Sequence, residues 1–134
     1  MAKSVAIVTG ASQGIGRATA IRLARDFAAL VLIARDRANL DDTANAVKAA
    51  GAEALVIDID LSEPRAAQVV VDRALVAFGR IDALLNIAGA VPQIDLFEMT
   101  DAQWEEGLAL KLHGARRLTI AAWPALRKPR VRWC

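Results

Sequence analysis

The chain has 134 residues, 55% of them hydrophobic and 24% charged, which predicts one globular domain with a packed core and excludes a disordered segment. Its single cysteine, Cys134, excludes an internal disulfide. No apolar run reaches the roughly 18 residues needed to cross a bilayer, and the first residues have no signal-peptide pattern, so we expect a cytoplasmic protein without a membrane segment.

The net charge of +2 is unevenly distributed. All 15 acidic residues but only 13 of the 17 basic residues lie within residues 1–126, which therefore carry a net charge of −2. We divide the chain into a domain at 1–126 and a basic tail at 127–134. A basic tail can bind nucleic acid or acidic membranes, whereas the plainer expectation is a solvated end.

In the first half of the chain, apolar runs at 4–9 and 29–34 predict two buried strands. A glycine-rich turn follows the first strand, and a helix is expected from that turn to about Phe27. After the second strand, Leu40, Ala44 and Val47 share one face of a helix that Gly51 can end.

In the second half, strands are expected at 54–58 and 82–86. Between them, Ser62 can cap a helix that ends at Gly79. A capping box formed by Thr100 and Gln103 should open a long helix that continues to about Arg127.

Continuous apolar strands separated by helices are typical of a parallel sheet that is covered on both faces. Right-handed crossovers place the four strands in the order 3-2-1-4, with helices on either side. The predicted fold is therefore α/β, the N-terminal half of a Rossmann-type doubly wound sheet.

The turn after the first strand has the chemistry of a phosphate-binding loop. Gly10 permits a sharp exit from the strand, Gly14 lets backbone N–H groups approach a pyrophosphate, and Gly16 allows close packing of the helix. The free N–H groups and dipole at the helix N-terminus favour an anion. The candidate cofactor-binding residues of this loop are Gly10, Ser12, Gln13, Gly14, Ile15 and Gly16.

The pattern T-G-x-x-x-G-x-G of residues 9–16 resembles the cofactor loop of short-chain dehydrogenases/reductases. Further stretches resemble the same family in order, so that the resemblance runs from residue 4 to about 127. These are Ile33-Ala34-Arg35-Asp36, Ile59-Asp60-Leu61-Ser62, Asn86-Ile87-Ala88-Gly89 and the helix from Trp104 to Pro124.

The resemblance implies a dinucleotide cofactor. Alanine stands at position 34, where relatives that prefer NAD carry an acid, and Arg35 could pair with a 2′-phosphate, so NADP(H) is favoured over NAD(H). The alternative is that Arg35 is a solvated loop residue beside Asp36.

Two further stretches are expected at the cofactor. By resemblance, Asp60 would accept a hydrogen bond from the adenine amino group and Leu61 would contact the ring, unless Asp60 is a second helix cap beside Ser62. Asn86 would help to hold the ribose and stabilise the sheet, and Ala88 and Gly89 would keep the backbone close to the cofactor. Isoleucine at position 87 departs from the family, which has asparagine there.

The long helix lines the active site in the family and helps to form a dimer interface, so association through residues 104–126 is expected. Lys111 stands where the family has an active-site asparagine. It could bind a carbonyl or a phosphate or tune a proton relay, or its stem could be buried with the ammonium in water. His113 is interpreted as an interface or surface residue.

Catalysis in the family needs a tyrosine, a lysine four residues later and an upstream serine. This chain has no tyrosine, and its serines, Ser4, Ser12 and Ser62, all precede the fourth strand. We therefore expect no complete catalytic set, no metal site and no turnover. Family members are about twice as long, and we interpret the chain as a truncated one whose basic end was read in a shifted frame.

Three functions follow. The leading one is an NADP(H)-binding fragment of a short-chain oxidoreductase; the alternatives are a regulatory protein that pairs with a full-length relative, and nucleic-acid binding by the tail. A truncated chain should also expose an apolar face of the long helix and have marginal stability and a tendency to self-associate. That face comprises Leu110, Gly114, Leu118 and Ala121.

Overall fold

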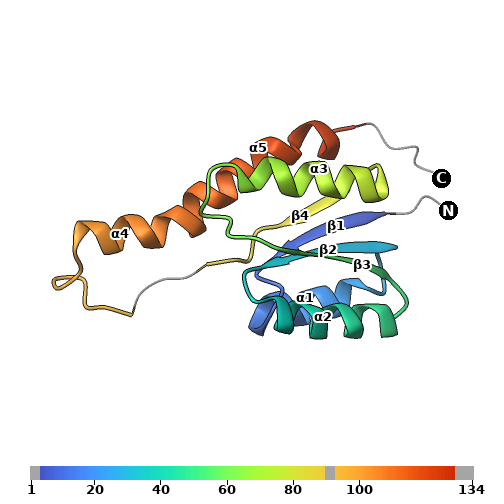
Figure 1. Cartoon of the computed structure of the whole chain (residues 1–134), viewed down its shortest axis with the longest axis horizontal. Helices are drawn as coiled ribbons and strands as arrows, with labels where there is room; N and C mark the ends of the chain where they lie inside the picture. The colour runs from blue at the N-terminus through green and yellow to red at the C-terminus, as the bar shows by residue number, and fades with distance from the viewer. Residues whose placement is uncertain (1–3, 90–92, 129–134) are drawn as a thin grey trace.

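A computed structural model describes residues 4–89 and 93–128 and contains a four-stranded sheet with helices on both faces (Figure 1). All neighbouring strands are parallel, and their order is β3-β2-β1-β4, as the apolar pattern predicts. The strands are β1 (Val5–Thr9), β2 (Ala29–Ala34), β3 (Glu53–Asp58) and β4 (Ala83–Leu85). The Rossmann-type half-fold is confirmed.

The two faces of the sheet are covered by different helices. In Figure 1, α1 (Gly14–Leu23) and α2 (Arg37–Ala49) lie on one face, and α3 (Ala66–Phe78) and α5 (Ala115–Leu126) lie on the other. Because successive side chains of a strand point to opposite faces, β1 contributes Ala6 and Val8 to the first core and Val5 and Ile7 to the second.

Two helix boundaries differ from the predicted ones. The first helix ends at Leu23 rather than near Phe27, because the backbone N–H groups of Arg25 and Asp26 donate three residues back, to Arg22 and Leu23, instead of four residues back as in an α-helix. Ser62 does not cap the next helix, which begins only at Ala66. The backbone N–H and the hydroxyl of Ser62 both donate to the Asp60 carboxylate, so Ser62 belongs to a separate turn before the helix.

The long helix has three parts. The predicted capping box is confirmed, since Thr100 and Gln103 hold each other's backbone N–H groups at the start of α4 (Asp101–Leu108). A π-helical segment, η1 (Ala109–Gly114), then joins α4 to α5. A Cβ on Gly114 would lie 2.7 Å from the carbonyl oxygen of Leu61, so the helix and the turn after β3 touch backbone to backbone.

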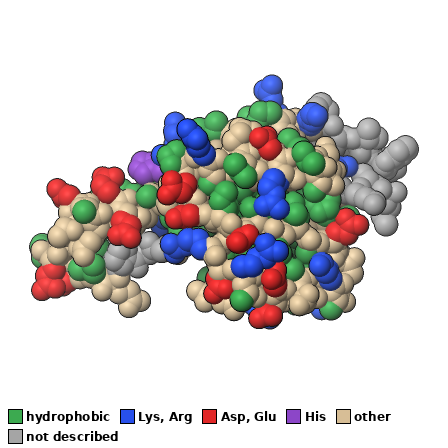
Figure 2. All heavy atoms as spheres, viewed as in Figure 1, with side chains coloured by type: hydrophobic (Ala, Val, Ile, Leu, Met, Phe, Trp, Pro, Cys, Tyr) green, Lys and Arg blue, Asp and Glu red, His purple; other side chains and the backbone are tan. Residues whose placement is uncertain are grey.

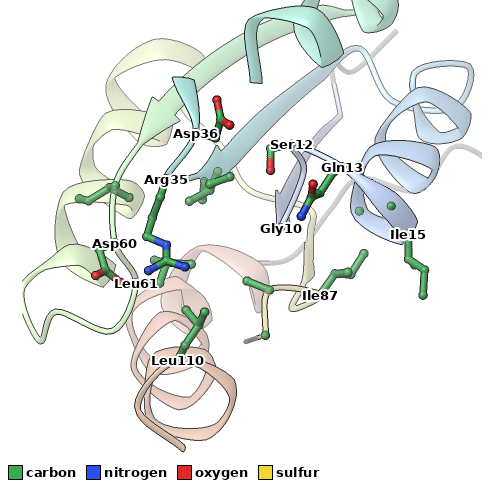
Figure 3. Close-up of a pocket in the computed structure, with 17 residues that line it drawn as sticks. Gly10, Ser12, Gln13, Ile15, Arg35, Asp36, Asp60, Leu61, Ile87 and Leu110 are labelled. Carbon is green, nitrogen blue, oxygen red and sulfur yellow. The ribbon is translucent and has the colours of Figure 1, made fainter. Parts of the chain in front are cut away.

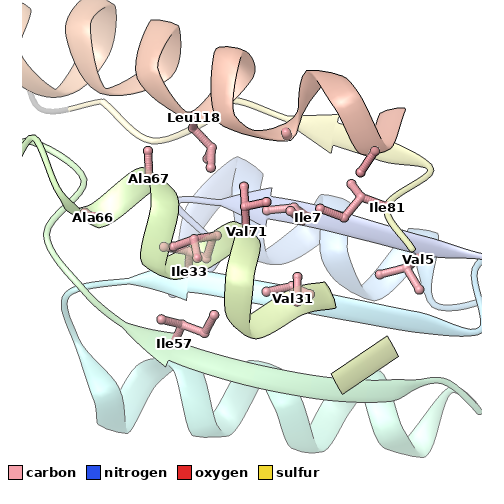
Figure 4. Packing of buried hydrophobic residues seen from close by; sticks show 14 of the residues in the cluster. Val5, Ile7, Val31, Ile33, Ile57, Ala66, Ala67, Val71, Ile81 and Leu118 are labelled. Carbon is pink, nitrogen blue, oxygen red and sulfur yellow. The ribbon is translucent and has the colours of Figure 1, made fainter. Parts of the chain in front are cut away.

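The prediction that this apolar face of the long helix is exposed is wrong. Gly114 and Leu118 are buried, and Leu110 and Ala121 pack against the core on the side of α3. In Figure 4, Leu118 reaches from α5 toward Ala67 of α3. The physical reason is that α3 already supplies an apolar surface, so this face needs no further strand to cover it.

Exposed apolar side chains lie elsewhere on the helix. Leu112, Ile120 and Trp123 are each more than half exposed. The segment 93–108, which we call the arm, projects from the body in Figure 1, and α4 has no buried residue. Within the described residues, no helix is both long and apolar enough to cross a membrane.

Candidate functional site

A cleft of about 480 Å³ lies at the carboxyl ends of the strands (Figure 3). Parallel α/β sheets bind ligands at this edge, outside the ends of the strands. All the predicted cofactor-binding residues line the cleft except Asn86. The full lining is Gly10, Ser12, Gln13, Gly14, Ile15, Gly16, Ile33, Ala34, Arg35, Asp36, Ile59, Asp60, Leu61, Ile87, Ala88, Gly89 and Leu110.

Two glycines make the loop between β1 and α1 compact. Gly10 has φ of 65°, and a Cβ there would lie 3.0 Å from the backbone of Ala88. A Cβ on Gly16 would collide with the carbonyl oxygen of Gly10. The first turn of α1 therefore lies directly against the exit from β1, and the close packing expected for Gly16 is with this loop.

The third glycine, Gly14, faces open space. It has φ of 57°, and no atom lies within 4 Å of the position where its Cβ would be. The N-cap residue Gln13 makes no side-chain hydrogen bond to the helix, and the first turn of α1 has no acidic residue. Uncapped N–H groups and the positive end of the helix dipole thus face an empty, accessible site that suits an anion.

Thr9 holds the two sides of the cleft together, which the sequence analysis did not foresee. Its hydroxyl is buried, donates to the carbonyl of Leu85 at 3.3 Å and accepts from the backbone N–H groups of Ile87 and Ala88, both at 2.9 Å. One side chain at the end of β1 therefore sets the path of the backbone that follows β4. A polar residue at the end of an apolar strand was the available signal.

Arg35 and Asp36 have different roles. Asp36 is the N-cap of α2, where its carboxylate accepts from the N–H of Asn39 at 3.0 Å and from the Asn39 amide at 2.8 Å. Among the described residues, Arg35 makes no hydrogen bond or ion pair. Figure 3 shows its guanidinium reaching into the cleft toward Leu61 and Leu110, while Asp36 points away.

The neighbouring Arg37 already forms ion pairs with two aspartates. Its guanidinium bonds Asp41 at 3.0 Å and Asp58 at 3.1 Å, and the hydrogen bond to Asp58 is the main reason why the pKa of Arg37 is raised. The pKa of Asp58 is lowered, first by a hydrogen bond from its own backbone N–H and then by Arg37. Of the two arginines near the end of β2, only Arg35 is available to a ligand.

Asp60 is held as a carboxylate at the rim of the cleft. Its Oδ1 accepts from the hydroxyl of Ser62 at 2.7 Å and from its backbone N–H at 2.9 Å. These bonds, in that order, lower the pKa of Asp60, and the charge of Arg35 adds to the effect. Both oxygens therefore act only as acceptors at neutral pH, with Oδ1 occupied by the turn.

Asn86 lies next to the cleft without lining it. Its side-chain amide donates to the hydroxyl of Thr119 in α5 at 3.1 Å. The same hydroxyl donates to the carbonyl of Ala115 one turn earlier. In this structure Asn86 connects the end of β4 to α5 and, unlike the other predicted residues, does not line the cleft.

The structure adds apolar walls that the motifs did not indicate. Leu110 of η1 faces the cleft beside Leu61 (Figure 3), and Ile59 lines the same region. Ile87, where the family pattern has asparagine, packs on the core under α1. These side chains form an apolar surface that suits the face of a planar ring.

Neither Lys111 nor His113 is among the residues that line the cleft, but the stem of Lys111 lies beside Gly89, which does line it, whereas His113 is half-buried. The Cδ and Cγ of Lys111 are 3.6 and 3.8 Å from the position where a Cβ on Gly89 would be. Within the described residues the Lys111 ammonium has no ion pair. The stem crosses Gly89, and the side chain is exposed.

Taken together, the cleft can hold an anion at α1, a ring against Leu61 and Leu110, and a second anion at Arg35. Its ionisable lining residues are Arg35, Asp36 and Asp60 among those described. The arrangement is that of a binding site for a phosphorylated nucleotide.

Comparison with known proteins agrees with this geometry. A family model described as short chain dehydrogenase matches residues 4–131. A short-chain reductase, NovJ, from Streptomyces niveus is 37% identical over 126 residues, which are 94% of this chain and 48% of that protein. A putative ketoacyl reductase of granaticin polyketide synthase from Streptomyces violaceoruber is 40% identical, over 91% of this chain and 49% of that protein.

Solved structures give the same result. A metagenomic short-chain oxidoreductase in complex with NADP has a TM-score of 0.87 and 38% identity, with 94% of this chain and 57% of that chain covered. Carveol dehydrogenase from Mycobacterium avium in complex with NAD has a TM-score of 0.86 and 25% identity, over 94% and 50%. The chain spans about half the length of the curated relatives it matches. By its sequence, its strand order and its glycine loop, the chain belongs to the short-chain dehydrogenase/reductase family.

Proposed function

We propose that these 134 residues bind NADP(H) in the cleft at the carboxyl ends of the strands. The observation that carries the proposal is the empty space at Gly14, directly in front of the uncapped N-terminus of α1. The diphosphate would accept hydrogen bonds from the first N–H groups of that helix. The adenine ring would lie against Leu61 and Leu110, with Asp60 at its edge.

The preference for NADP(H) over NAD(H) rests on Arg35. Ala34 leaves no carboxylate at the end of β2, and the Asp36 carboxylate in the lining is already bonded to Asn39 as the cap of α2, so Arg35 is the charged group available to a ligand at this end of the cleft. A guanidinium can form two charge-assisted hydrogen bonds with a 2′-phosphate. Of the two solved structures compared above, one is in complex with NADP and the other with NAD, so the preference for one nucleotide has to be measured on this chain.

Binding is tested by titrating NADPH and NADH while following nucleotide fluorescence, with calorimetry as a second readout. Gly14→Ala should abolish or strongly weaken binding of both nucleotides, because its Cβ enters the space proposed for the diphosphate. Gly79→Ala is the matched control, since Gly79 also has positive φ and open space but ends α3. Both variants should lose about 1 kcal/mol of stability.

Arg35→Met should weaken NADPH binding roughly tenfold and leave NADH binding unchanged. An equal loss of affinity for NADPH and NADH would show that Arg35 is not the basis of the preference for NADP(H). If the wild-type chain binds neither nucleotide, the proposed function itself is wrong.

We propose further that the whole protein reduces a carbonyl group or oxidises an alcohol, as an oxidoreductase of this family, in the cytoplasm. The 134 residues contain no tyrosine, and their three serines lie before β4. We therefore expect purified chain to bind the nucleotide without turnover. Oxidation of NADPH by this chain in the presence of a panel of ketones and aldehydes would contradict that expectation.

Association through the long helix is proposed as a second property. The arm, residues 93–108, contains five acidic and no basic residues, and Figure 2 shows acidic side chains gathered on it. Residues 109–128 contain five lysines and arginines and no acidic residues. The opposite charges, next to exposed Trp104 and Trp123, favour pairing with a second copy or with a full-length relative. The nucleic-acid alternative concerns the tail, of which 129–134 lie outside the described residues.

A further inference from the structure

We propose that Lys111 is a third phosphate-binding element of the cleft, whose ammonium pairs with the diphosphate of the dinucleotide. The inference rests on the proposed function and adds a residue that the family pattern does not supply, since the chain has lysine where the family has asparagine.

The position of Lys111 follows from a short series of contacts. A Cβ on Gly10 would lie 3.0 Å from the backbone of Ala88, so the glycine loop and the segment after β4 touch at this point. Gly89 follows Ala88 and lines the cleft, and the stem of Lys111 lies across Gly89. Only one carbon separates the Cδ from the ammonium, so the ammonium cannot lie far from Gly89 and this edge of the cleft.

The absence of a side chain at Gly89 is what permits this approach. The Cγ and Cδ of Lys111 are at ordinary van der Waals distance, 3.8 and 3.6 Å, from the point where a Cβ would be. The stem is thus supported by backbone, while the ammonium at its end remains in solvent, as lysines commonly arrange themselves. The residue is exposed, so it can reach a ligand without losing a buried contact.

The local charges leave the Lys111 ammonium available. Its nearest acids along the helix are Glu105 and Glu106, and neither forms an ion pair with it in the described structure. In the cleft, the Asp36 carboxylate is held by the start of α2, and one Asp60 oxygen is held by Ser62. A diphosphate carries two negative charges, whereas the glycine loop offers only neutral N–H groups.

The π-helical segment places the lysine. Because η1 changes the helical repeat between α4 and α5, the direction of residue 111 differs from that in a regular helix. Leu110 then faces the ring site beside Leu61, while Lys111 crosses Gly89. Adjacent residues of one segment can therefore contact the ring and the diphosphate of the same molecule.

The test compares two nucleotides and four variants of the chain. Lys111→Met should weaken the binding of NADPH and of NADH by the same factor, about fivefold, because both contain the diphosphate. Lys111→Arg keeps the charge and should retain most of the affinity. Lys48→Met is the matched control, since it removes the same charge from the last turn of α2, away from the cleft, and should bind as the wild type does. Arg35→Met should affect NADPH alone.

Salt provides a second readout. The dependence of NADH affinity on salt concentration should be shallower in Lys111→Met than in the wild type, because one ion pair is missing. Unchanged binding by Lys111→Met, or equal loss in Lys111→Met and Lys111→Arg, would overturn the inference while leaving the proposed function intact. Failure of the wild-type chain to bind either nucleotide would overturn the proposed function and, with it, the role of Lys111.

Discussion

Single residues decide the shape of the cleft through their backbone contacts. Gly16 must lack a side chain because the carbonyl of Gly10 occupies that space, and Gly14 must lack one if an anion is to reach the N-terminus of α1. These requirements are local, within eight residues of chain, which is why the sequence alone predicts them. Arg35 and Asp60 are equally predictable, since Arg35 directly follows β2 and Asp60 comes two residues after the end of β3.

Other residues of the site depend on partners far along the chain, and the sequence does not show them. Asn86 donates to Thr119, which is 33 residues later, and so does not line the cleft. Ser62 could have capped a helix, but Asp60 accepts both of its donors first. Asp60 and Ser62 are both suitable capping residues, and the sequence motif does not show which of them bonds to which group.

Thr9 provides a test at the residue scale. Thr9→Val keeps the shape of the side chain but leaves two backbone N–H groups, of Ile87 and Ala88, without their acceptor. We expect the free energy of unfolding to fall by about 1–3 kcal/mol, measured by urea denaturation. Thr9→Ser retains the hydroxyl, so its free energy of unfolding should fall clearly less than that of Thr9→Val. Equal stability of Thr9→Val and the wild type would show that these bonds contribute nothing.

At the scale of elements, the strands were the most predictable part of the fold. Each contains a continuous apolar run, and the expected order β3-β2-β1-β4 is confirmed. The long helix was less predictable, because its hydrophobic pattern fits a regular helix whereas the structure contains the π-helical η1. The same segment contacts the backbone of Leu61 at Gly114, and only the tertiary structure creates that contact.

The packing of α5 can be tested with two residues on different faces of it. Leu118→Ala should lower the free energy of unfolding by about 2–5 kcal/mol, because Leu118 is fully buried between α5, α3 and the sheet. Ile120→Ala, which changes a residue 57% exposed, should cost less than about 1 kcal/mol. Urea denaturation gives both values. The reverse order would mean that α5 is rotated about its axis.

At the scale of the whole molecule, exposed apolar surface is concentrated on the arm and on the outer side of α5. If this surface mediates self-association, Ile120→Lys combined with Trp123→Lys should shift sedimentation velocity profiles toward the monomer. Val76→Lys is the matched control, because Val76 is 89% exposed and belongs to a different helix, α3. A monomeric wild type, or an equal effect of the Val76 variant, would contradict association through α5.

Acid should destabilise the fold through Asp58 and Asp60, whose pKa values are both lowered. A carboxylate with a lowered pKa in the folded state adds stability above its unfolded pKa, near 3.9 for aspartate, and loses it as pH falls toward the folded value. Their contribution should therefore be constant from pH 7 to about 5 and decline below about 4. In urea denaturation measured over a series of pH values, Asp60→Asn should reduce this decline in stability. An unchanged pH profile would show that Asp60 does not contribute to the loss of stability in acid.

The cleft joins parts of the molecule that pack separately. Its glycine loop and Ile87 rest on the core beneath α1 and α2, whereas Leu61 and Leu110 rest on the core beneath α3 and α5. A bound dinucleotide would contact both layers and so link them. At a free concentration a hundred times its dissociation constant, it would add about 2.7 kcal/mol to the free energy of unfolding. Protease cleavage sites on both sides of the sheet should then become protected together, although the ligand touches only one edge.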